Sequence, residues 1–199
     1  MIYPSSIEKL IESFKELPGI GDKTAERLAF SIMDLEDEKV AQFSVSLMDV
    51  KKKIKKCKIC NHLTESETCN ICNDKKRNKK ILCIVEEPKN VILFEKIGTY
   101  NGLYHVLDGL ISPLDGVNPE DINIDSLVKR IEKGDFEELI FALKPSIEGE
   151  TTMLYISKIL AGFNIIISKI AYGIPMGADM EYIDTMTLEA ALAERKKIA

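Results

Sequence analysis

The sequence has no apolar run that approaches the roughly 18 residues needed to cross a membrane. Its N-terminal stretch also lacks the basic region and following apolar segment of a secretory leader. We therefore expect neither export nor membrane insertion, and we expect a cytoplasmic protein. With 199 residues, of which 45% are apolar and 30% charged, the chain can bury a core and form one medium-sized domain or two to three small ones.

Without export, the five cysteines are poor candidates for disulfides. Four of them form two C-x-x-C pairs with eight residues between the pairs: Cys57 and Cys60, then Cys69 and Cys72. Each pair can hold one side of a tetrahedral Zn²⁺, whereas two disulfides would leave Cys83 over. We predict one structural zinc ion per chain, since four thiolates leave no open position for water or substrate, and we expect His62 to be an ordinary loop residue.

Charge is distributed unevenly along the chain. Residues 51–80 hold eleven Lys and Arg against three Asp and Glu, a local charge of +8 in a chain whose net charge is −5. Most of these cations form two blocks, at 51–56 and 75–80, on either side of the cysteines. A solvated tether would account for the blocks, but clustered lysines release phosphate counterions, so we favour a surface that faces a polyanion.

The N-terminal residues have the periodicity of helices. Ser5 opens a capping box with Glu8 for a first helix that ends before Pro18, and Asp22 is placed to cap a second helix. A third helix is expected from Glu38 into the first basic block. Its apolar residues recur at intervals of three and four: Val40, Phe43, Leu47, Val50 and Ile54. This stripe predicts a packing face, either within the chain or against a second copy.

The connector at residues 17–21, LPGIG, suits a hairpin that binds phosphate. Gly19 and Gly21 permit positive φ angles and leave backbone N–H groups uncovered, beside the positive dipole end of the next helix. Lys23 and Arg27 lie four residues apart on that helix. A plain turn between two helices is the alternative. The two cations favour DNA binding by these four residues, through phosphates and without base readout.

After the cysteines, short apolar runs alternate with helical patterns, which predicts a parallel α/β sheet. The expected strands are residues 81–85, 103–107, 139–143 and 164–170, and the expected helices are 91–97, 122–132, 144–161 and 180–197. Cys83 lies in the first strand and is expected to be a buried, unreactive thiol. Glu86 and residues 144–150 follow strands, so they are expected at the edge where parallel sheets bind ligands.

Five stretches, in order, are similar to the RecR family of bacterial recombination mediators. They are the hairpin at 17–25, the four cysteines, ISPLDG at 111–116, PSIEGE at 145–150 and GIPMGADMEY at 173–182. The resemblance spans essentially the whole chain and implies a multidomain α+β protein. Its parts would be a helix-hairpin-helix module at 1–55, a four-cysteine zinc finger at 56–78, an α/β Toprim domain with a parallel sheet at 79–172, and a C-terminal turn and helix at 173–199.

The same resemblance implies a role in recombinational DNA repair. It implies homo-oligomers, dimers or ring-shaped tetramers, that clamp gapped, single-stranded or double-stranded DNA and act with RecO and RecF at single-strand gaps, in the cytoplasm at the nucleoid. Lys23 and Arg27 match the family's DNA-contacting positions. Glu86 matches the Toprim acidic position, and the partner-contacting surface is expected to include Glu148.

The Toprim segment departs from the catalytic pattern. Catalytic members bind Mg²⁺ through a D-x-D-x-E-like cluster and a glutamate after the first strand. Lys144, Ser146 and Glu148 stand where the cluster would be, so both aspartates are missing. An ammonium beside Glu86 and Glu148 would replace the charge of a metal and repel the metal. We therefore predict a vestigial site in a protein that is not an enzyme.

Two other functions remain as alternatives. A metal-dependent Toprim enzyme, such as a nuclease or primase, would turn over DNA, which the missing aspartates argue against. A protein-interaction adaptor would use its acidic Toprim surface, with DNA binding incidental. Salt separates the mediator from the adaptor, because binding dominated by phosphates weakens steeply as salt rises.

Overall fold

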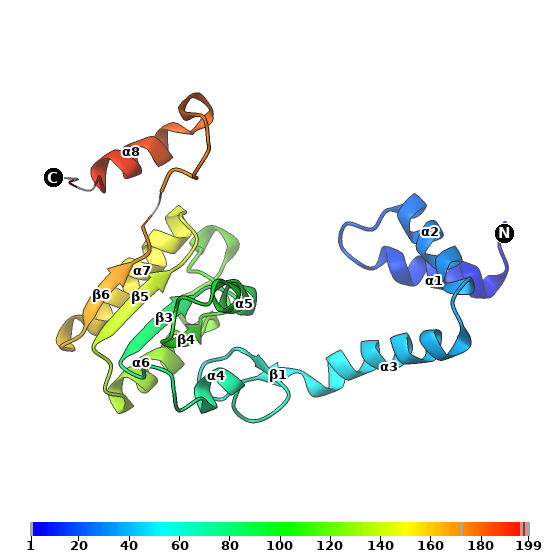
Figure 1. The fold of residues 1–199 in the computed structure, drawn as a ribbon, viewed down its shortest axis with the longest axis horizontal. Helices are drawn as coiled ribbons and strands as arrows, with labels where there is room; N and C mark the ends of the chain where they lie inside the picture. Colours follow the sequence, from blue (N-terminus) through cyan, green and yellow to red (C-terminus); the bar gives the residue numbers. More distant parts are fainter. Residues whose placement is uncertain (1, 172, 196, 198–199) are drawn as a thin grey trace. The chain divides into compact units, whose positions relative to one another are not determined.

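The computed structural model describes residues 2–171, 173–195 and 197, and the chain divides into two compact units between Ile54 and Lys55 (Figure 1). The division falls within the first basic block. None of the helices in the described part of the chain is long and apolar enough to cross a membrane.

The first unit consists of three helices: α1 (Ser5–Lys15), α2 (Asp22–Met33) and α3 (Asp37–Lys53). α1 and α2 pack against each other as a hairpin. Ala25 and Ala29 are the only fully buried residues that the structure describes in this unit. The ring of Tyr3 packs edge-on against Phe30 with 5.7 Å between centroids and covers one side of the hairpin. The unit therefore has a very small core of its own.

Two of the expected helix caps are wrong. Ser5 is already inside α1, because Pro4 occupies the cap position and its carbonyl accepts the N–H groups of Ile7 and Glu8 over 2.9 and 3.1 Å. Asp22 is the first residue of α2 and Gly21 precedes it as the cap, with no side-chain cap among the described residues. The first N–H groups of α2 are therefore not covered by a capping side chain.

The second unit is built on a four-stranded sheet of parallel strands in the order β4-β3-β5-β6. Its strands are β3 (Ile81–Val85), β4 (Leu103–Val106), β5 (Glu138–Ala142) and β6 (Ile166–Lys169). All four lie within a residue or two of the expected positions. β3, β4 and β5 were recognisable because strands covered on both faces are nearly continuous apolar runs, whereas β6 is largely exposed.

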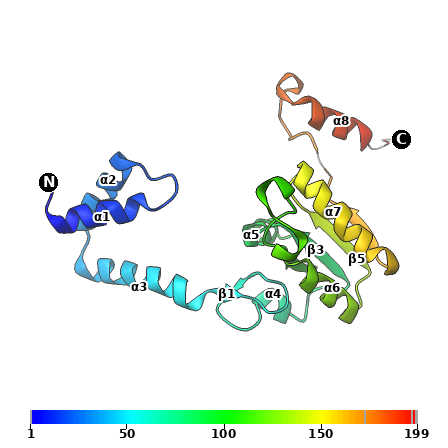
Figure 2. The ribbon, with the colours of Figure 1, turned by 180° about the vertical axis from the view of Figure 1, so that it is seen from behind.

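Helices cover both faces of the sheet. Leu82 and Ile84 of β3 pack towards the side of α6 (Ile124–Lys133) and α7 (Ile147–Ile159), which lie in front of the sheet in Figure 2. Cys83 and Val85 point the other way, towards α5 (Pro88–Ile97). Burial raises the pKa of Cys83 to about 12, as expected for an unreactive core thiol.

Some helix bounds differ from expectation. α5 begins at Pro88 instead of 91, since Pro fits the first helical position and the Asn90 amide oxygen accepts the Glu87 N–H over 2.8 Å. The last helix is short, and Lys196 of its expected basic end lies outside the described residues. The remaining elements are β1 (Lys55–Lys56), β2 (Leu63–Thr64), α4 (Asn70–Asn73), α8 (Thr185–Ala193) and four 3₁₀ turns at Pro113–Asp115, Pro119–Asp121, Leu160–Gly162 and Met180–Tyr182.

Candidate DNA-binding, zinc and Toprim sites

The connector between α1 and α2 presents backbone and cations together. Gly19 has a φ of +82°, a left-handed conformation that other residues rarely adopt, and Gly21 caps α2. Lys23 and Arg27 are exposed on the first two turns of α2, and neither forms an ion pair with any described residue. The structure thus brings the four predicted DNA-binding residues to the start of one helix. Their contact with DNA stays a prediction.

A lysine neutralises the carboxylate at this helix start. Nζ of Lys15 lies 2.9 Å from Asp22 and 3.1 Å from Glu12, and these hydrogen bonds, that to Asp22 first, raise the pKa of Lys15. An unpaired Asp22 would repel a phosphate at the start of α2. With Asp22 paired, the charges that Lys23 and Arg27 offer there are not cancelled.

The cysteines lie at the ends of two short turns. The first pair follows β1, which pairs antiparallel with β2, and the second pair flanks the start of α4. Asn61 adopts a left-handed φ of +61° after the first pair, and its N–H donates to the carbonyl of Cys57 over 2.9 Å. The N–H of Cys57 donates to the carbonyl of His62 over 2.7 Å. These backbone bonds hold the first turn in a conformation that directs both thiols inward.

The four thiols form a compact cluster suited to one zinc ion. Their Sγ atoms all lie within 4.8 Å of one another, and those of Cys60 and Cys69 are 3.6 Å apart. Tetrahedral coordination with Zn–S bonds of about 2.3 Å places sulfurs about 3.8 Å apart, so the cluster fits the ion. The N–H of Cys69 lies 3.3 Å from Sγ of Cys57 and that of Cys72 lies 3.5 Å from Sγ of Cys69, as donors to thiolates. The predicted zinc cofactor is therefore confirmed.

Electrostatics in the cluster also favour a cation. Hydrogen bonds from Cys60 and Cys72 hold the pKa of Cys69 well below that of a free thiol, and the Cys69 thiolate in turn raises the pKa of Cys60. A zinc ion supplies the positive charge that lets all four be thiolates at once. Half-buried His62 is not part of the cluster, and burial lowers its pKa.

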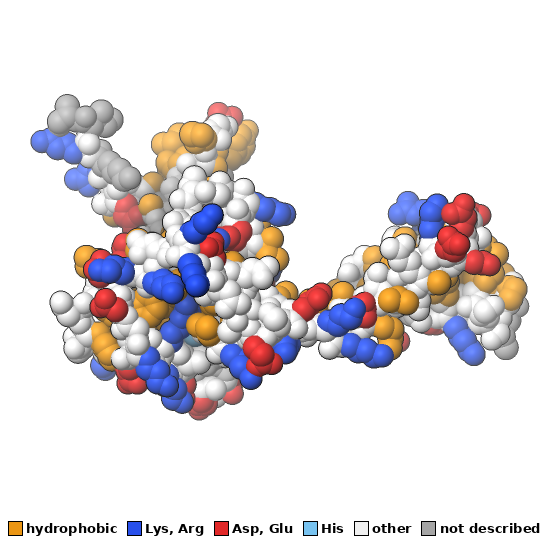
Figure 3. Space-filling model, turned by 60° about the horizontal axis from the view of Figure 1, so that its bottom comes forward, with side chains coloured by type: hydrophobic (Ala, Val, Ile, Leu, Met, Phe, Trp, Pro, Cys, Tyr) orange, Lys and Arg blue, Asp and Glu red, His pale blue; other side chains and the backbone are white. Residues whose placement is uncertain are grey.

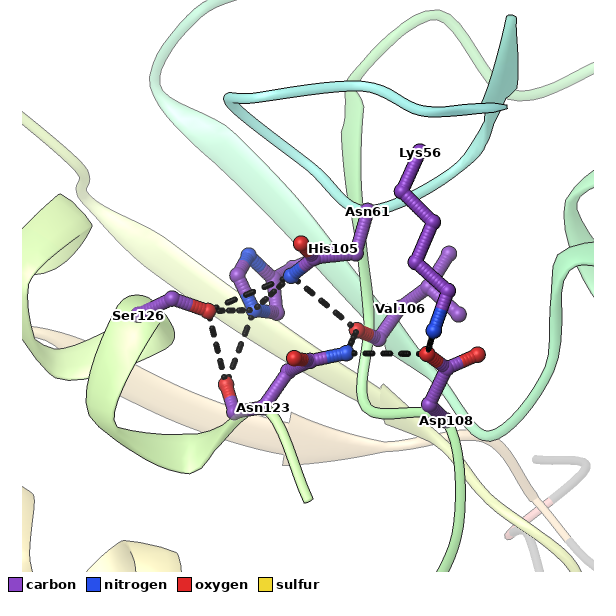
Figure 4. A network of polar contacts seen from close by, with 7 residues as sticks. All are labelled: Lys56, Asn61, His105, Val106, Asp108, Asn123 and Ser126. Atoms are coloured by element: carbon purple, nitrogen blue, oxygen red, sulfur yellow. Dashed lines mark hydrogen bonds and ion pairs between the residues drawn. The ribbon is translucent and has the colours of Figure 1, made fainter. Parts of the chain in front are cut away.

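Polar contacts join this zinc-binding segment to the sheet (Figure 4). The amide nitrogen of Asn61 lies 3.2 Å from Oγ of Ser126 and 3.4 Å from Nε2 of His105. The ammonium of Lys56 pairs with the carboxylate of Asp108. His105 is fully buried, and this burial lowers its pKa to about 4, so the ring is neutral and its Nε2–H donates to the carbonyl of Asn123 over 3.1 Å. This network was not expected from the sequence.

Glu86 and Lys144 both lie at the carboxyl edge of the sheet, as expected from their positions directly after two predicted strands. β3 and β5 are parallel neighbours, and the two residues that follow them line one cavity of about 530 Å³. Burial raises the pKa of Glu86, as does the charge of Glu87, whereas the ammonium groups of Lys144 and Lys89 lower it. Lys144 therefore acts as a counter-charge to Glu86.

Ser146 and Glu148 lie beside this cavity, at the start of α7, and are not among its lining residues. Oγ of Ser146 caps the helix by accepting the N–H of Gly149 over 3.3 Å. Glu148 is half-buried, and its hydrogen bond with Ser146 and the nearby charge of Lys144 both lower its pKa. Gly149 is required because a Cβ there would collide with the carbonyl oxygen of Lys144. The ammonium charge of Lys144 therefore acts on both carboxylates, that of Glu86 and that of Glu148.

Comparisons with known proteins cover almost the whole chain. Family models described as RecR helix-hairpin-helix, RecR four-cysteine zinc finger domain, Toprim domain and RecR C-terminal match residues 7–51, 54–74, 80–171 and 173–196. The proteins named Recombination protein RecR from Staphylococcus aureus strains JH9, Newman and USA300 are each 48% identical over 198 residues, which covers 100% of both chains. The predicted order of hairpin, zinc finger and Toprim domain is confirmed, and the chain belongs to the RecR family of recombination proteins.

Proposed function

We propose that this protein is a non-catalytic mediator of recombinational DNA repair that clamps DNA at single-strand gaps and works with RecO and RecF at the cytoplasmic nucleoid. The start of α2 carries this proposal. Its N–H groups lack a side-chain cap among the described residues, its first-turn carboxylate Asp22 is paired with Lys15, and Lys23 and Arg27 are exposed and unpaired there. Such a helix start attracts phosphate without selecting bases.

The clamp requires more than one chain, and α3 supports self-association. Its apolar stripe is largely exposed, with 44% of Phe43, 58% of Leu47 and 62% of Val50 accessible. A second copy of the chain would cover this stripe, and several hairpins in one assembly would multiply the few phosphate contacts that each provides. We propose a dimer or a ring-shaped tetramer on this ground.

The lysine at the Toprim edge supports a role without turnover. Lys144 stands near both Glu86 and Glu148, where a catalytic domain would need carboxylates to hold Mg²⁺. Incubation of purified protein with nicked or gapped DNA and Mg²⁺ or Mn²⁺ tests this part of the proposal. No cleavage, ligation or synthesis is expected, and an activity that Glu86→Ala abolishes would overturn it.

DNA affinity at several salt concentrations tests the hairpin assignment. Lys23→Ala with Arg27→Ala should weaken binding to gapped DNA and make the plot of log affinity against log salt less steep by about 1.4 to 1.8, the value for two lost phosphate contacts. Lys9→Ala with Lys39→Ala removes the same charge from other exposed sites of the first unit and should change the slope little. If the Lys23 and Arg27 double variant binds like wild type, the protein is better described as an adaptor.

A further inference from the structure

A second basic surface lies on the larger unit, between the zinc-binding segment and the end of α6. Two hollows, of about 440 and 560 Å³, share four lining residues: Ile59, Arg130, Gly134 and Phe136. Because they share these residues, the hollows form one shallow groove, which we call the α6 groove. Ile59 lies between the first two cysteines, so the zinc site fixes one wall. The groove lies wholly within the second unit.

The lining of the α6 groove is strongly cationic. Its charged residues are Lys58, Lys79, Lys80, Lys129, Arg130 and Lys133, against Asp135. Lys129 and Lys133 are exposed one turn apart on α6, and neither forms an ion pair with a described residue. The same holds for Lys79 in the loop before β3. These three ammonium groups are thus available to an external anion.

The other two lysines that line the groove already have partners. Lys58 pairs with Glu67 and Lys80 with Glu137, both in exposed positions. The dipole of α6 favours a cation in its last turn, which gives Lys133 a structural explanation. It does not explain Lys79, which reaches the groove from a different element. The convergence of free lysines from two separate elements therefore points to a ligand.

The floor of the α6 groove is apolar and fixed. Ile59 is 42% exposed. The guanidinium of Arg130 lies over the half-buried ring of Phe136, 5.7 Å from the ring centroid. Arg130 also donates to the carbonyl of Tyr104 over 2.6 Å, which holds its side chain in place. Figure 3 shows Lys and Arg side chains around exposed hydrophobic side chains on the larger unit. Proteins that bind single-stranded nucleic acids combine a cationic groove with side chains, most often aromatic, against which bases lie.

We infer that the α6 groove is a second nucleic-acid site, which takes the phosphate backbone of single-stranded DNA against Lys79, Lys129 and Lys133 and a base against Ile59. The inference rests on the proposed function only in taking DNA as the ligand. The hairpin offers phosphate contacts at the start of a helix, whereas the α6 groove places lysines from two elements beside an apolar floor, so the two sites would divide the work. The hairpin would bind both single-stranded and double-stranded DNA, and the α6 groove would favour the single-stranded DNA of a gap.

Charge reversal in the groove tests the inference with a matched control. Lys129→Glu with Lys133→Glu is compared with Lys96→Glu and Lys158→Glu, which make the same change on exposed, unpaired lysines of α5 and α7 among the described residues. Binding of a fluorescent oligo-dT is measured by anisotropy over a series of salt concentrations. Loss of two phosphate contacts should make the plot of log affinity against log salt less steep by about 1.4. When salt rises four-fold, the factor by which affinity falls should therefore be roughly seven times smaller for the groove variant than for wild type. The control should keep the wild-type slope.

Lysine labelling of the wild-type protein gives an answer that does not depend on a variant folding. Oligo-dT should protect Lys79, Lys129 and Lys133 from acetylation, and a duplex of equal length should protect them less. Unprotected groove lysines at saturating oligo-dT would overturn the inference. So would a groove variant that has normal zinc content and mass and binds oligo-dT with the wild-type slope.

Two further outcomes distinguish a DNA groove from binding by the hairpin alone and from a protein-binding surface. If only the Lys23 and Arg27 double variant loses affinity, the α6 groove is wrong and the hairpin proposal stands; the reverse result would leave the groove and overturn the hairpin. If poly-L-glutamate protects the groove lysines and oligo-dT does not, the surface belongs to an acidic protein, and the inference of a DNA site fails.

Discussion

The carbonyl oxygen of Cys60 accepts a hydrogen bond of 2.9 Å from the backbone N–H of Val106. A zinc-binding cysteine is thereby attached to β4, the strand at one edge of the sheet. This bond occupies a donor that an edge strand would otherwise leave open. The zinc-binding segment therefore belongs structurally to the larger unit.

Loss of one zinc ligand should damage folding before any binding function. Cys57→Ser leaves three thiolates without the geometry of a closed site, so zinc content should fall from one ion per chain and the larger unit should unfold at lower temperature. Metal analysis and thermal unfolding measure both. Cys83→Ala is the control, since it removes a buried cysteine outside the cluster and should keep the zinc. A stable zinc-free Cys57→Ser protein of normal mass would show that the ion is dispensable.

Buried His105 should make the larger unit less stable in mild acid. Its folded pKa of about 4 lies below the ordinary value of 6.5, so its contribution to stability is complete above pH 6.5 and is lost as pH falls towards 4. At pH 5 the loss should be about 2 kcal/mol relative to pH 7, because the unfolded state then binds nearly one more proton than the folded state. Chemical denaturation between pH 7 and 5, with excess zinc, measures it.

His105→Gln is the variant for that comparison. Its stability should be lower at pH 7, because the glutamine does not reproduce the contacts to Asn123 and Ser126, but it should vary less between pH 7 and 5. The guanidinium charge of Arg130, which also lowers the pKa of the ring, is unchanged in the variant. Equal pH slopes for the two proteins would show that His105 is not the group responsible.

Glu86 should oppose folding when it is ionised. Burial raises its pKa, so the folded state disfavours the carboxylate, and stability is lost as pH rises above the ordinary range for a glutamate. Glu86→Gln should therefore stabilise the protein at pH 7, with a benefit that fades in acid. Thermal unfolding at pH 7 and pH 4 measures this difference, with Glu120→Gln at an exposed turn as control. Destabilisation at pH 7 would indicate that the carboxylate makes a favourable contact instead.

The exposed stripe on α3 should be required for self-association. Leu47→Glu places a charge on the stripe and should reduce the mass measured by light scattering towards that of one chain. Ser46→Glu adds the same charge at the neighbouring position, where the hydroxyl only contacts the carbonyl of Gln42, and should leave the mass unchanged. A wild-type protein that is strictly monomeric, with and without gapped DNA, would count against any ring.

Patterns local in the sequence predicted most of the fold. The strand at 81–85 was placed correctly because a buried parallel strand is apolar at every position, and the cysteine spacing located the zinc site. The caps at Ser5 and Asp22 were misplaced because several residues near a helix start compete for the same N–H groups. In α1 the carbonyl of Pro4 satisfies them. Which residue caps the helix depends on the backbone dihedral angles at the helix start, and these cannot be derived from the sequence alone.

Contacts between distant residues were beyond this reasoning. Asn61 and His105 are separated by 44 positions, and Lys56 and Asp108 by 52. The only signal was indirect: a histidine inside an apolar strand needs a polar partner somewhere. Glu86 and Lys144 were placed together because a parallel sheet brings strand ends to one edge, a rule that needs no knowledge of particular contacts.

The small core of the first unit has a consequence for how its stability is measured. Two alanine side chains contribute little hydrophobic free energy, since a buried methyl or methylene group is worth only about 0.8 kcal/mol. If neighbouring chains supply the missing burial, the hairpin is ordered by mass action, and its melting temperature rises with protein concentration while that of the sheet unit does not. Dilution would then switch off DNA binding by the hairpin, because the hairpin itself would unfold, so the amount of protein in the cell would set the fraction of hairpins competent to bind.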